Sequence, residues 1–238
     1  MKRTYRLLAA LLALMLVLSG CGAPPPEETE PASIQAEAPA TEPPATEPQE
    51  RPASLGHFED RTYINEYLGF SMEFDESWTI KTAEELQEIP ANIAEILKDT
   101  SVGENIAELT QIMDMQAENV QQLCSVNVLY QALSVQERLM YMGMSDEEIM
   151  DGMLSQSEML EESYTQMGLE VESIDKVQVT FCGETRYALK CVCVLADMKY
   201  YTLQIFDYNL GRYGVVTTFA CFNEDITGDL AAMCQGVG

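Results

Sequence analysis

Sulfur and carboxylate side chains carry most of the reactive chemistry in this 238-residue sequence, because it contains a single histidine, His57. One histidine leaves little room for Ser-His-Asp triads or His-rich metal sites. The motifs G-x-S-x-G and H-E-x-x-H do not occur, nor does a glycine-rich phosphate loop. We therefore expect no catalytic residues, no cofactor and no metal site. A carboxylate-dependent hydrolase stays open as an alternative, since the 39 Asp and Glu residues supply many pairs.

Cys21 follows a pattern typical of an export signal. Three basic residues, Lys2, Arg3 and Arg6, precede the unbroken apolar run 7–18. This run is short for a membrane span, which needs about 20 residues, but it has the normal length for the apolar region of a signal peptide. The pattern predicts that the chain leaves the cytoplasm.

The four residues Leu18-Ser19-Gly20-Cys21 resemble the lipobox of bacterial lipoproteins. The resemblance implies a signal peptide over residues 1–20, cleavage between Gly20 and Cys21, and a diacylglycerol on the Cys21 thiol. Such lipid chains anchor a protein without a transmembrane helix. We expect the protein on the extracytoplasmic face of the bacterial cell membrane, held there by Cys21. An ordinary signal peptide with an incidental cysteine is the alternative.

The charge balance excludes one class of partner. With 13 Lys and Arg against 39 Asp and Glu, the net charge is −26, and removal of residues 1–20 takes away three basic groups and no acid. Phosphate affinity comes from basic side chains, so no nucleic acid is expected as a partner. Anionic lipid headgroups would repel such an acidic surface, so we expect the diacylglycerol on Cys21 to be the membrane anchor. A basic envelope protein or ligand is the expected partner.

Composition divides the chain after the signal peptide. Nine of the ten prolines fall between Pro24 and Pro52, interleaved with Ala, Thr and Glu. Proline denies hydrogen bonds to helices and sheets, so we predict that residues 21–56 are the lipidated cysteine and an extended tether, with an exposed His57 at its end. Residues 57–238 contain one proline and predict a single globular domain. A proline-motif ligand is the alternative for the tether.

Alternating apolar residues predict a hairpin over residues 62–74, with Phe70, Met72 and Phe74 on its buried side. Trp78, after this hairpin, is expected to be a packing anchor rather than a ligand platform. Thr82 to Glu85 have the spacing of a capping box and predict a helix, which Pro90 kinks or restarts.

Further along, residues 112–132 read as strands. A second capping box, Ser145 to Glu148, predicts a single helix that continues to Met167 and ends at Gly168. Strands then follow until about Phe222. Register favours a three-residue loop over 182–184, and a short terminal helix is expected over 229–235.

Several of these features resemble the PsbP/Mog-like domain: Tyr63-x-Asn65 followed by Gly69-Phe70, Trp78 before a capped acidic helix, Gly183 in a strand turn, and a closing antiparallel meander. The resemblance covers about residues 60–235. It implies an α+β fold, an α/β/α sandwich around a mainly antiparallel sheet, and a role in docking or assembly rather than catalysis. Independently, apolar residues on both faces of the late strands predict a helical layer on each side of the sheet.

Six cysteines follow Cys21, and their redox state is open. They are Cys124, Cys182, Cys191, Cys193, Cys221 and Cys234. Most fall at apolar strand positions, which favours buried thiols that pack as small hydrophobes. An even number of cysteines in an exported chain permits disulfides, with 15 pairings for six. No Cys-x-x-Cys occurs, so a cysteine zinc site is not expected.

Two other groups of residues could bind cations. Met140, Met142 and Met144 form a Met-x-Met-x-Met run, and thioethers select Cu(I). A soft-metal binder is therefore a further alternative function, while core packing beneath the second helix is the expected role of these side chains. The acids at the predicted helix starts are Glu84, Glu85, Asp146, Glu147 and Glu148, where the helix dipole favours negative charge. Glu158, Glu161 and Glu162 are expected on a solvated helix face.

Overall fold

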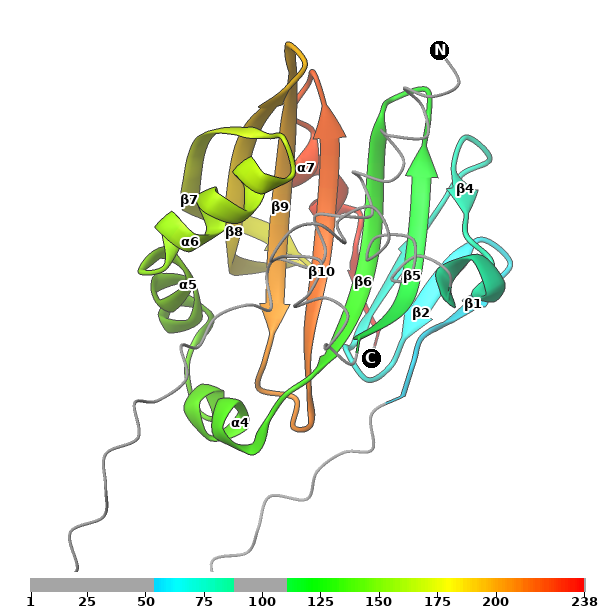
Figure 1. Ribbon diagram of the computed structural model, residues 1–238. Helices are drawn as coiled ribbons and strands as arrows, with labels where there is room; N and C mark the ends of the chain where they lie inside the picture. Colours follow the sequence, from blue (N-terminus) through cyan, green and yellow to red (C-terminus); the bar gives the residue numbers. More distant parts are fainter. Residues whose placement is uncertain (1–53, 88–110, 238) are drawn as a thin grey trace, which may run out of the picture.

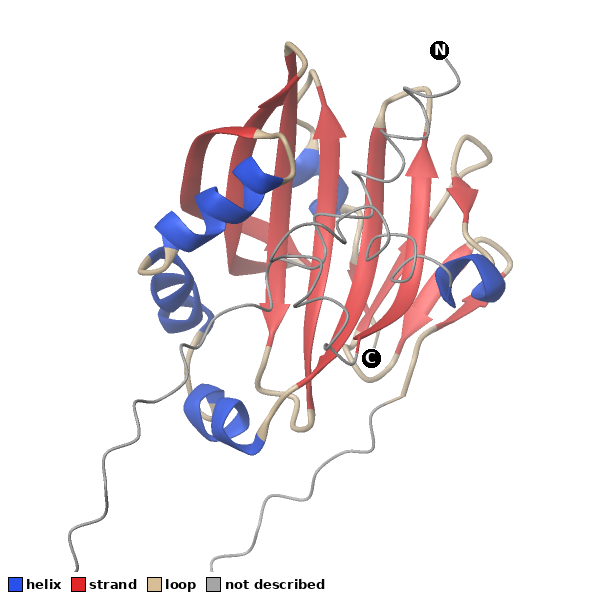
Figure 2. Cartoon of the chain, viewed as in Figure 1, coloured by secondary structure: helices blue, strands red, loops and turns tan. Residues whose placement is uncertain are grey.

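The computed structural model describes residues 54–87 and 111–237, which form an α+β fold of two antiparallel sheets and short helices (Figure 1, Figure 2). The larger sheet has seven strands in the order β4-β5-β6-β10-β9-β8-β7. In chain order these are β4 (Thr79–Ile80), β5 (Gln111–Asn119), β6 (Cys124–Ala132), β7 (Glu170–Phe181), β8 (Glu184–Leu195), β9 (Met198–Asp207) and β10 (Tyr213–Phe222). The strands predicted within residues 112–132 and from 170 to 222 are confirmed.

A four-stranded sheet, in the order β1-β2-β3-β11, packs on the larger one. Its strands are β1 (His57–Glu59), β2 (Thr62–Asn65), β3 (Phe70–Glu73) and β11 (Gln235–Gly236). The predicted hairpin is β2–β3: Phe70, Met72 and Phe74 are buried, whereas Glu73 is exposed. Trp78 is buried and packs edge-on against the Phe74 ring, with 5.3 Å between ring centroids, as expected of a packing anchor.

Capping boxes open three of the helical segments in the described part of the chain. The Thr82 and Ser145 boxes are confirmed: Thr82 N–H donates to Glu85 at 2.8 Å before a helix over residues 83–87, and Ser145 caps α5 (Asp146–Leu154). The residues that were to continue the first helix, Pro90 among them, lie outside the described residues. A third box, between Ser134 and Glu137, opens α4 (Val135–Tyr141). Neither this box nor this helix was predicted from the sequence.

The second predicted helix is wrong in its length. Two helices, α5 and α6 (Ser157–Gln166), replace the single helix from Ser145 to Met167. The chain leaves helical geometry at Gln156, and the Ser155 hydroxyl turns back to donate to Gly152 O at 2.6 Å. Serine that bonds to its own backbone competes with the helix, and a glycine three residues earlier weakens it further.

The α6 helix ends where the sequence indicated, because Gly168 adopts a φ of +82°.

A layer covers each face of the larger sheet. Helices α5 and α6 pack on one face, where Ile149, Leu160 and Tyr164 contact the apolar residues of β8, β9 and β10. The small sheet covers the other face together with α7 (Thr227–Ala232). A terminal helix was predicted over 229–235, but α7 begins two residues earlier and Gln235 belongs to β11. Burial on both faces is confirmed, but the second layer consists largely of strands rather than of helices. No helix among the described residues is both long and apolar enough to cross a bilayer.

The β7–β8 turn corrects the predicted register by one residue. Phe181 pairs with Glu184 and Val179 with Arg186, so the loop is the two residues Cys182-Gly183 rather than three. Both loop residues have positive φ, +54° and +78°, as a type I′ turn requires. Because this turn follows the twist of the strands, it is favoured over the three-residue loop even though cysteine seldom adopts such a φ.

Candidate functional site

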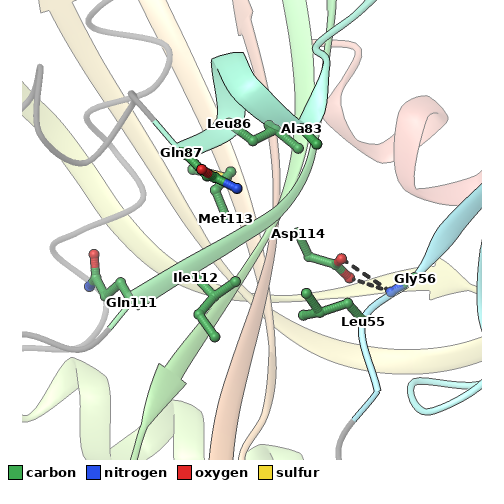
Figure 3. Close-up of a pocket in the computed structure, with 9 residues that line it drawn as sticks. All are labelled: Leu55, Gly56, Ala83, Leu86, Gln87, Gln111, Ile112, Met113 and Asp114. Carbon is green, nitrogen blue, oxygen red and sulfur yellow. Dashed lines mark hydrogen bonds between the residues drawn. The ribbon is translucent and has the colours of Figure 1, made fainter.

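A half-buried carboxylate, Asp114, is the centre of a polar hydrogen-bond network. It lies in β5 at a β-bulge, where the pairing with β6 shifts between Met113, opposite Leu129, and Met115, opposite Val128. A bulge adds a residue that has no partner on the neighbouring strand and turns its side chain out of the alternating pattern. Asp114 therefore points toward the start of the described chain, as Figure 3 shows.

Three groups from two distant segments donate to the Asp114 carboxylate. The Gly56 N–H lies 2.9 Å from Oδ2 and 3.1 Å from Oδ1, the Tyr63 hydroxyl 2.6 Å from Oδ2, and Asn65 Nδ2 2.9 Å from Oδ2. Gly56 can approach this closely because it has no side chain: a Cβ there would lie 2.4 Å from the Tyr63 ring.

The Asn65 amide extends the network to Tyr130, whose hydroxyl lies 2.8 Å from Nδ2 and donates to Ser54 O at 3.2 Å. We call these six residues the Asp114 cluster. Its members are Ser54, Gly56, Tyr63, Asn65, Asp114 and Tyr130.

Burial sets the electrostatics of the cluster. It raises the pKa of Asp114, against the hydrogen bonds from Tyr63, Gly56 and Asn65, which act to lower it. Burial, followed by the charge of Asp114, raises the pKa of Tyr63 as well. The proton in the hydrogen bond between Tyr63 and Asp114 therefore stays on the Tyr63 oxygen. A carboxylate that accepts this many hydrogen bonds is held in one place, so the cluster clamps the incoming chain at Ser54 and Gly56 to the sheet.

A cavity of about 390 Å³ opens beside the clamp (Figure 3). Its walls are mostly apolar, with two amides and one carboxylate. The lining residues are Leu55, Gly56, Ala83, Leu86, Gln87, Gln111, Ile112, Met113 and Asp114.

Two partly buried ion pairs of Arg186 join three elements. Arg186 in β8 pairs with Asp146, the first residue of α5, and its Nη2 lies 3.0 Å from Asp207 Oδ1 at the end of β9. Burial acts to lower the pKa of Arg186, but the charges of Asp207 and Asp146 outweigh it and raise that pKa. This arrangement fixes the start of α5 on the sheet, so Asp146 serves as more than a helix-dipole acid.

In this structure no bond joins any two of the six cysteines after Cys21, and all of them except the half-buried Cys182 are buried. Burial raises the pKa of Cys124 and Cys193 to about 12 and that of Cys191 and Cys221 to about 11. Thiols in this state are poor nucleophiles and poor metal ligands. Their expected burial is confirmed. Cys21 and Gly20, the predicted lipidation and cleavage sites, lie outside the described residues.

The methionine run is only partly placed as expected. Met140 and Met142 are exposed, so a core-packing role is wrong for them, whereas Met144 is half-buried and packs against the core beneath α5 and α6. The helix that carries Met140, α4, has no buried residue, which explains why its side chains face solvent.

The predicted acidic residues lie where helix and solvent favour them. Glu147 and Glu148 occupy the first turn of α5, and Glu158, Glu161 and Glu162 are exposed on α6. His57 is exposed, with its Nε2 3.7 Å from Glu59. Across residues 54–87 and 111–237, no three or more His, Cys, Asp or Glu residues gather closely enough to hold a metal ion.

Comparisons with known proteins add no family. No family model matches the chain, and a search of the curated proteins found no match.

Proposed function

We propose that this protein is a bacterial lipoprotein, anchored through Cys21 to the extracytoplasmic face of the cell membrane, whose domain binds a protein or envelope ligand without catalysis. The observation that carries the proposal is the run Leu18-Ser19-Gly20-Cys21 behind a basic start and a short apolar stretch. A proline-rich tether then separates the lipid from the fold. The likeness to the PsbP/Mog-like domain is part of the same proposal.

The Asp114 cluster supports binding over hydrolysis. A carboxylate pair in a glycosidase needs one acid free to donate a proton and a second free to attack or to activate water. Asp114, the carboxylate at the cavity, is instead occupied by Gly56, Tyr63 and Asn65. Its role is to hold the chain where the tether joins the fold, which gives the domain a fixed attachment point.

The acidic surface supports a basic partner. Exposed carboxylates crowd α5 and α6, among them Glu147, Glu158 and Glu161, and the whole chain has a net charge of −26. Such a field raises the association rate with positively charged surfaces, and salt screens it. Tethering keeps the domain near envelope partners at a high effective concentration.

Mass spectrometry of the membrane fraction tests the anchor. The mature chain should begin at Cys21 and carry a diacylglycerol, and Cys21→Ala should abolish the lipid and the membrane retention. Cys182→Ala is the matched control, because it removes a half-buried thiol of the folded domain and should leave both unchanged. A wild-type chain with an unmodified Cys21 would overturn the proposal.

Capture of envelope proteins by the purified chain tests the binding role. Capture should weaken as salt rises from about 0.05 to 0.5 M, since this shortens the Debye length from roughly 14 to 4 Å. A different result would be that the chain hydrolyses envelope glycan in an assay and that a single carboxylate-to-amide substitution abolishes this activity. Such a result would favour the carboxylate-dependent hydrolase over the binding role.

A further inference from the structure

Two of the buried thiols lie directly across a strand pair. Cys124, the first residue of β6, and Cys221, near the end of β10, are register partners in the centre of the seven-stranded sheet. Directly opposed residues point to the same face of a sheet. Both side chains belong to the core beneath the small sheet, with exposed fractions of 1% and 0%.

The hydrogen-bond pattern next to this pair decides its spacing. The Phe222 N–H donates to Leu123 O at 3.0 Å, so Leu123 and Phe222 form a hydrogen-bonded pair. Because the two kinds alternate along an antiparallel ladder, Cys124 and Cys221 form a non-hydrogen-bonded pair, in which Cα atoms are about 4.5 Å apart. Disulfides span Cα separations of about 4.4–6.8 Å. The backbone therefore already holds these cysteines within bridging range.

No other two cysteines in the described strand pairs are register partners. Cys191 and Cys193 lie two residues apart on β8, where the Cα separation is about 6.6–6.8 Å, at the limit for a bridge. They also face the core on the helical side, away from Cys124 and Cys221. Among the strand pairs of the described residues, the register thus favours one bond, Cys124–Cys221.

We propose that Cys124 and Cys221 are joined by a disulfide in the exported protein, an inference that rests on the export contained in the proposed function. The bond forms by thiol–disulfide exchange with an oxidising disulfide donor. The two thiols lose two protons and two electrons, one S–S bond forms between them, and the donor's S–S bond is reduced to two thiols.

Burial fixes when this step takes place. A donor cannot reach thiols that are at most 1% exposed, and folding raises the pKa of both, which removes the thiolate that exchange requires. Oxidation therefore precedes the closing of the small sheet over Cys124. Once formed, the bond closes a loop of about 100 residues and is protected from reduction, so its role is stabilisation.

The experiment is peptide mapping of the full chain, extracted from membranes into detergent after free thiols have been blocked by an alkylating reagent under denaturing conditions. We expect a linked peptide pair that contains Cys124 and Cys221, and alkylated Cys191 and Cys193. Reduction should lower the melting temperature by roughly 5–15 °C. Alkylation of both Cys124 and Cys221, or a bond from either one to another cysteine, would overturn the inference.

Two alanine variants sharpen the melting comparison. In Cys124→Ala the difference between the oxidised and reduced chain should vanish, whereas the matched control Cys193→Ala, equally buried on the opposite face, should retain it. Should Cys124→Ala fail to fold, the wild-type peptide map and the effect of reduction on its melting still decide the matter.

A replaced signal peptide separates this inference from the proposed function. If the wild-type chain is lipidated but Cys124 and Cys221 are both alkylated, the disulfide inference is overturned and the proposed function is not. If Cys21 proves unmodified, the chain is exported behind an unrelated cleavable signal peptide and mapped in the same way. A Cys124–Cys221 bond in that protein would support the inference while the proposed function fails.

Discussion

At the scale of single residues, Asp114 shows what a sequence pattern can and cannot reveal. The apolar alternation of β5 predicts a strand there, but a bulge is invisible to periodicity, because an extra residue only shifts the pattern by one. The partners of Asp114 come from Gly56 and the β2 strand, about 50 or more residues earlier, and nothing local marks them as neighbours. The ion pairs of Arg186 could not be predicted for the same reason.

Replacing the clamp's carboxylate should weaken the fold. In Asp114→Asn the new amide places a donor against the N–H of Gly56 and the hydroxyl of Tyr63, so at least one buried hydrogen bond is lost, at a cost of about 1–3 kcal/mol in the free energy of unfolding. Urea denaturation measures this cost. Asp197→Asn is the control, since Asp197 is exposed in a turn at a φ of +69° that asparagine also accepts. Equal stability of both variants would contradict the clamp.

The same variant gives a pH prediction. Burial raises the folded-state pKa of Asp114 above the unfolded value of about 4, so the folded chain keeps this proton where the unfolded chain has lost it. Its contribution to stability is then fully present below pH 4 and is lost as pH rises through the raised pKa. The stability difference between wild type and Asp114→Asn should shrink over this range in urea melts. A difference that grows with pH would show that the hydrogen bonds outweigh burial.

At the scale of secondary-structure elements, helix ends could be predicted where residues interact with the nearby backbone. Two capping boxes and Gly168 were read correctly because their chemistry is local. The failures were places where two local preferences compete. Ser155 breaks a helix that apolar spacing would continue, and the Cys182-Gly183 turn accepts a strained cysteine in order to match the strand twist.

The two capping boxes at α4 and α5 should differ in their effect on stability. Ser145→Ala removes the cap of a helix that buries Ile149 and Met150, so it should lower the free energy of unfolding by about 1 kcal/mol. Ser134→Ala removes the same cap from α4, which buries no residue, so the helix can fray without cost to the core. Guanidinium melts of both variants make the comparison. Equal losses would mean that α4 is bound to the core more firmly than its exposure indicates.

The β7–β8 turn offers a stabilising substitution. Cys182→Asn should leave stability unchanged or raise it by a few tenths of a kcal/mol, because asparagine accepts a φ of +54° and Asn-Gly is the favoured type I′ pair. Gly183→Ala should instead cost about 1 kcal/mol, since alanine is strained at a φ of +78° although nothing stands in its way. Thermal melting in reducing buffer keeps disulfide effects out of the comparison. The opposite ranking would favour the three-residue loop.

At the scale of the whole molecule, burial of the large sheet on both faces followed from its apolar strands, whereas the nature of the second layer did not. That layer depends on β11, which pairs with β3 across some 160 residues, and such long-range pairing leaves no local trace. The Pro-rich composition placed the start of the domain at residue 57. The Asp114 cluster reaches back to Ser54 and so draws three more residues into the fold.

Two truncated chains test where the folded domain begins. A chain that starts at Ser54 should unfold with the same free energy as one that starts at Gly22, because it keeps every residue of the Asp114 cluster. A chain that starts at Phe58 loses the Gly56 N–H and the Ser54 carbonyl, which should cost about 1–3 kcal/mol. In an Asp114→Asn background this loss should shrink, since the Gly56 N–H then has a poorer acceptor. Urea melts of the Ser54 and Phe58 chains, each with and without Asp114→Asn, complete this double-mutant cycle. A loss of folding in the chain that starts at Ser54 would show that the preceding tether belongs to the domain. Equal stability of the Ser54 and Phe58 chains would show that the Asp114 cluster does not fasten the tether to the fold.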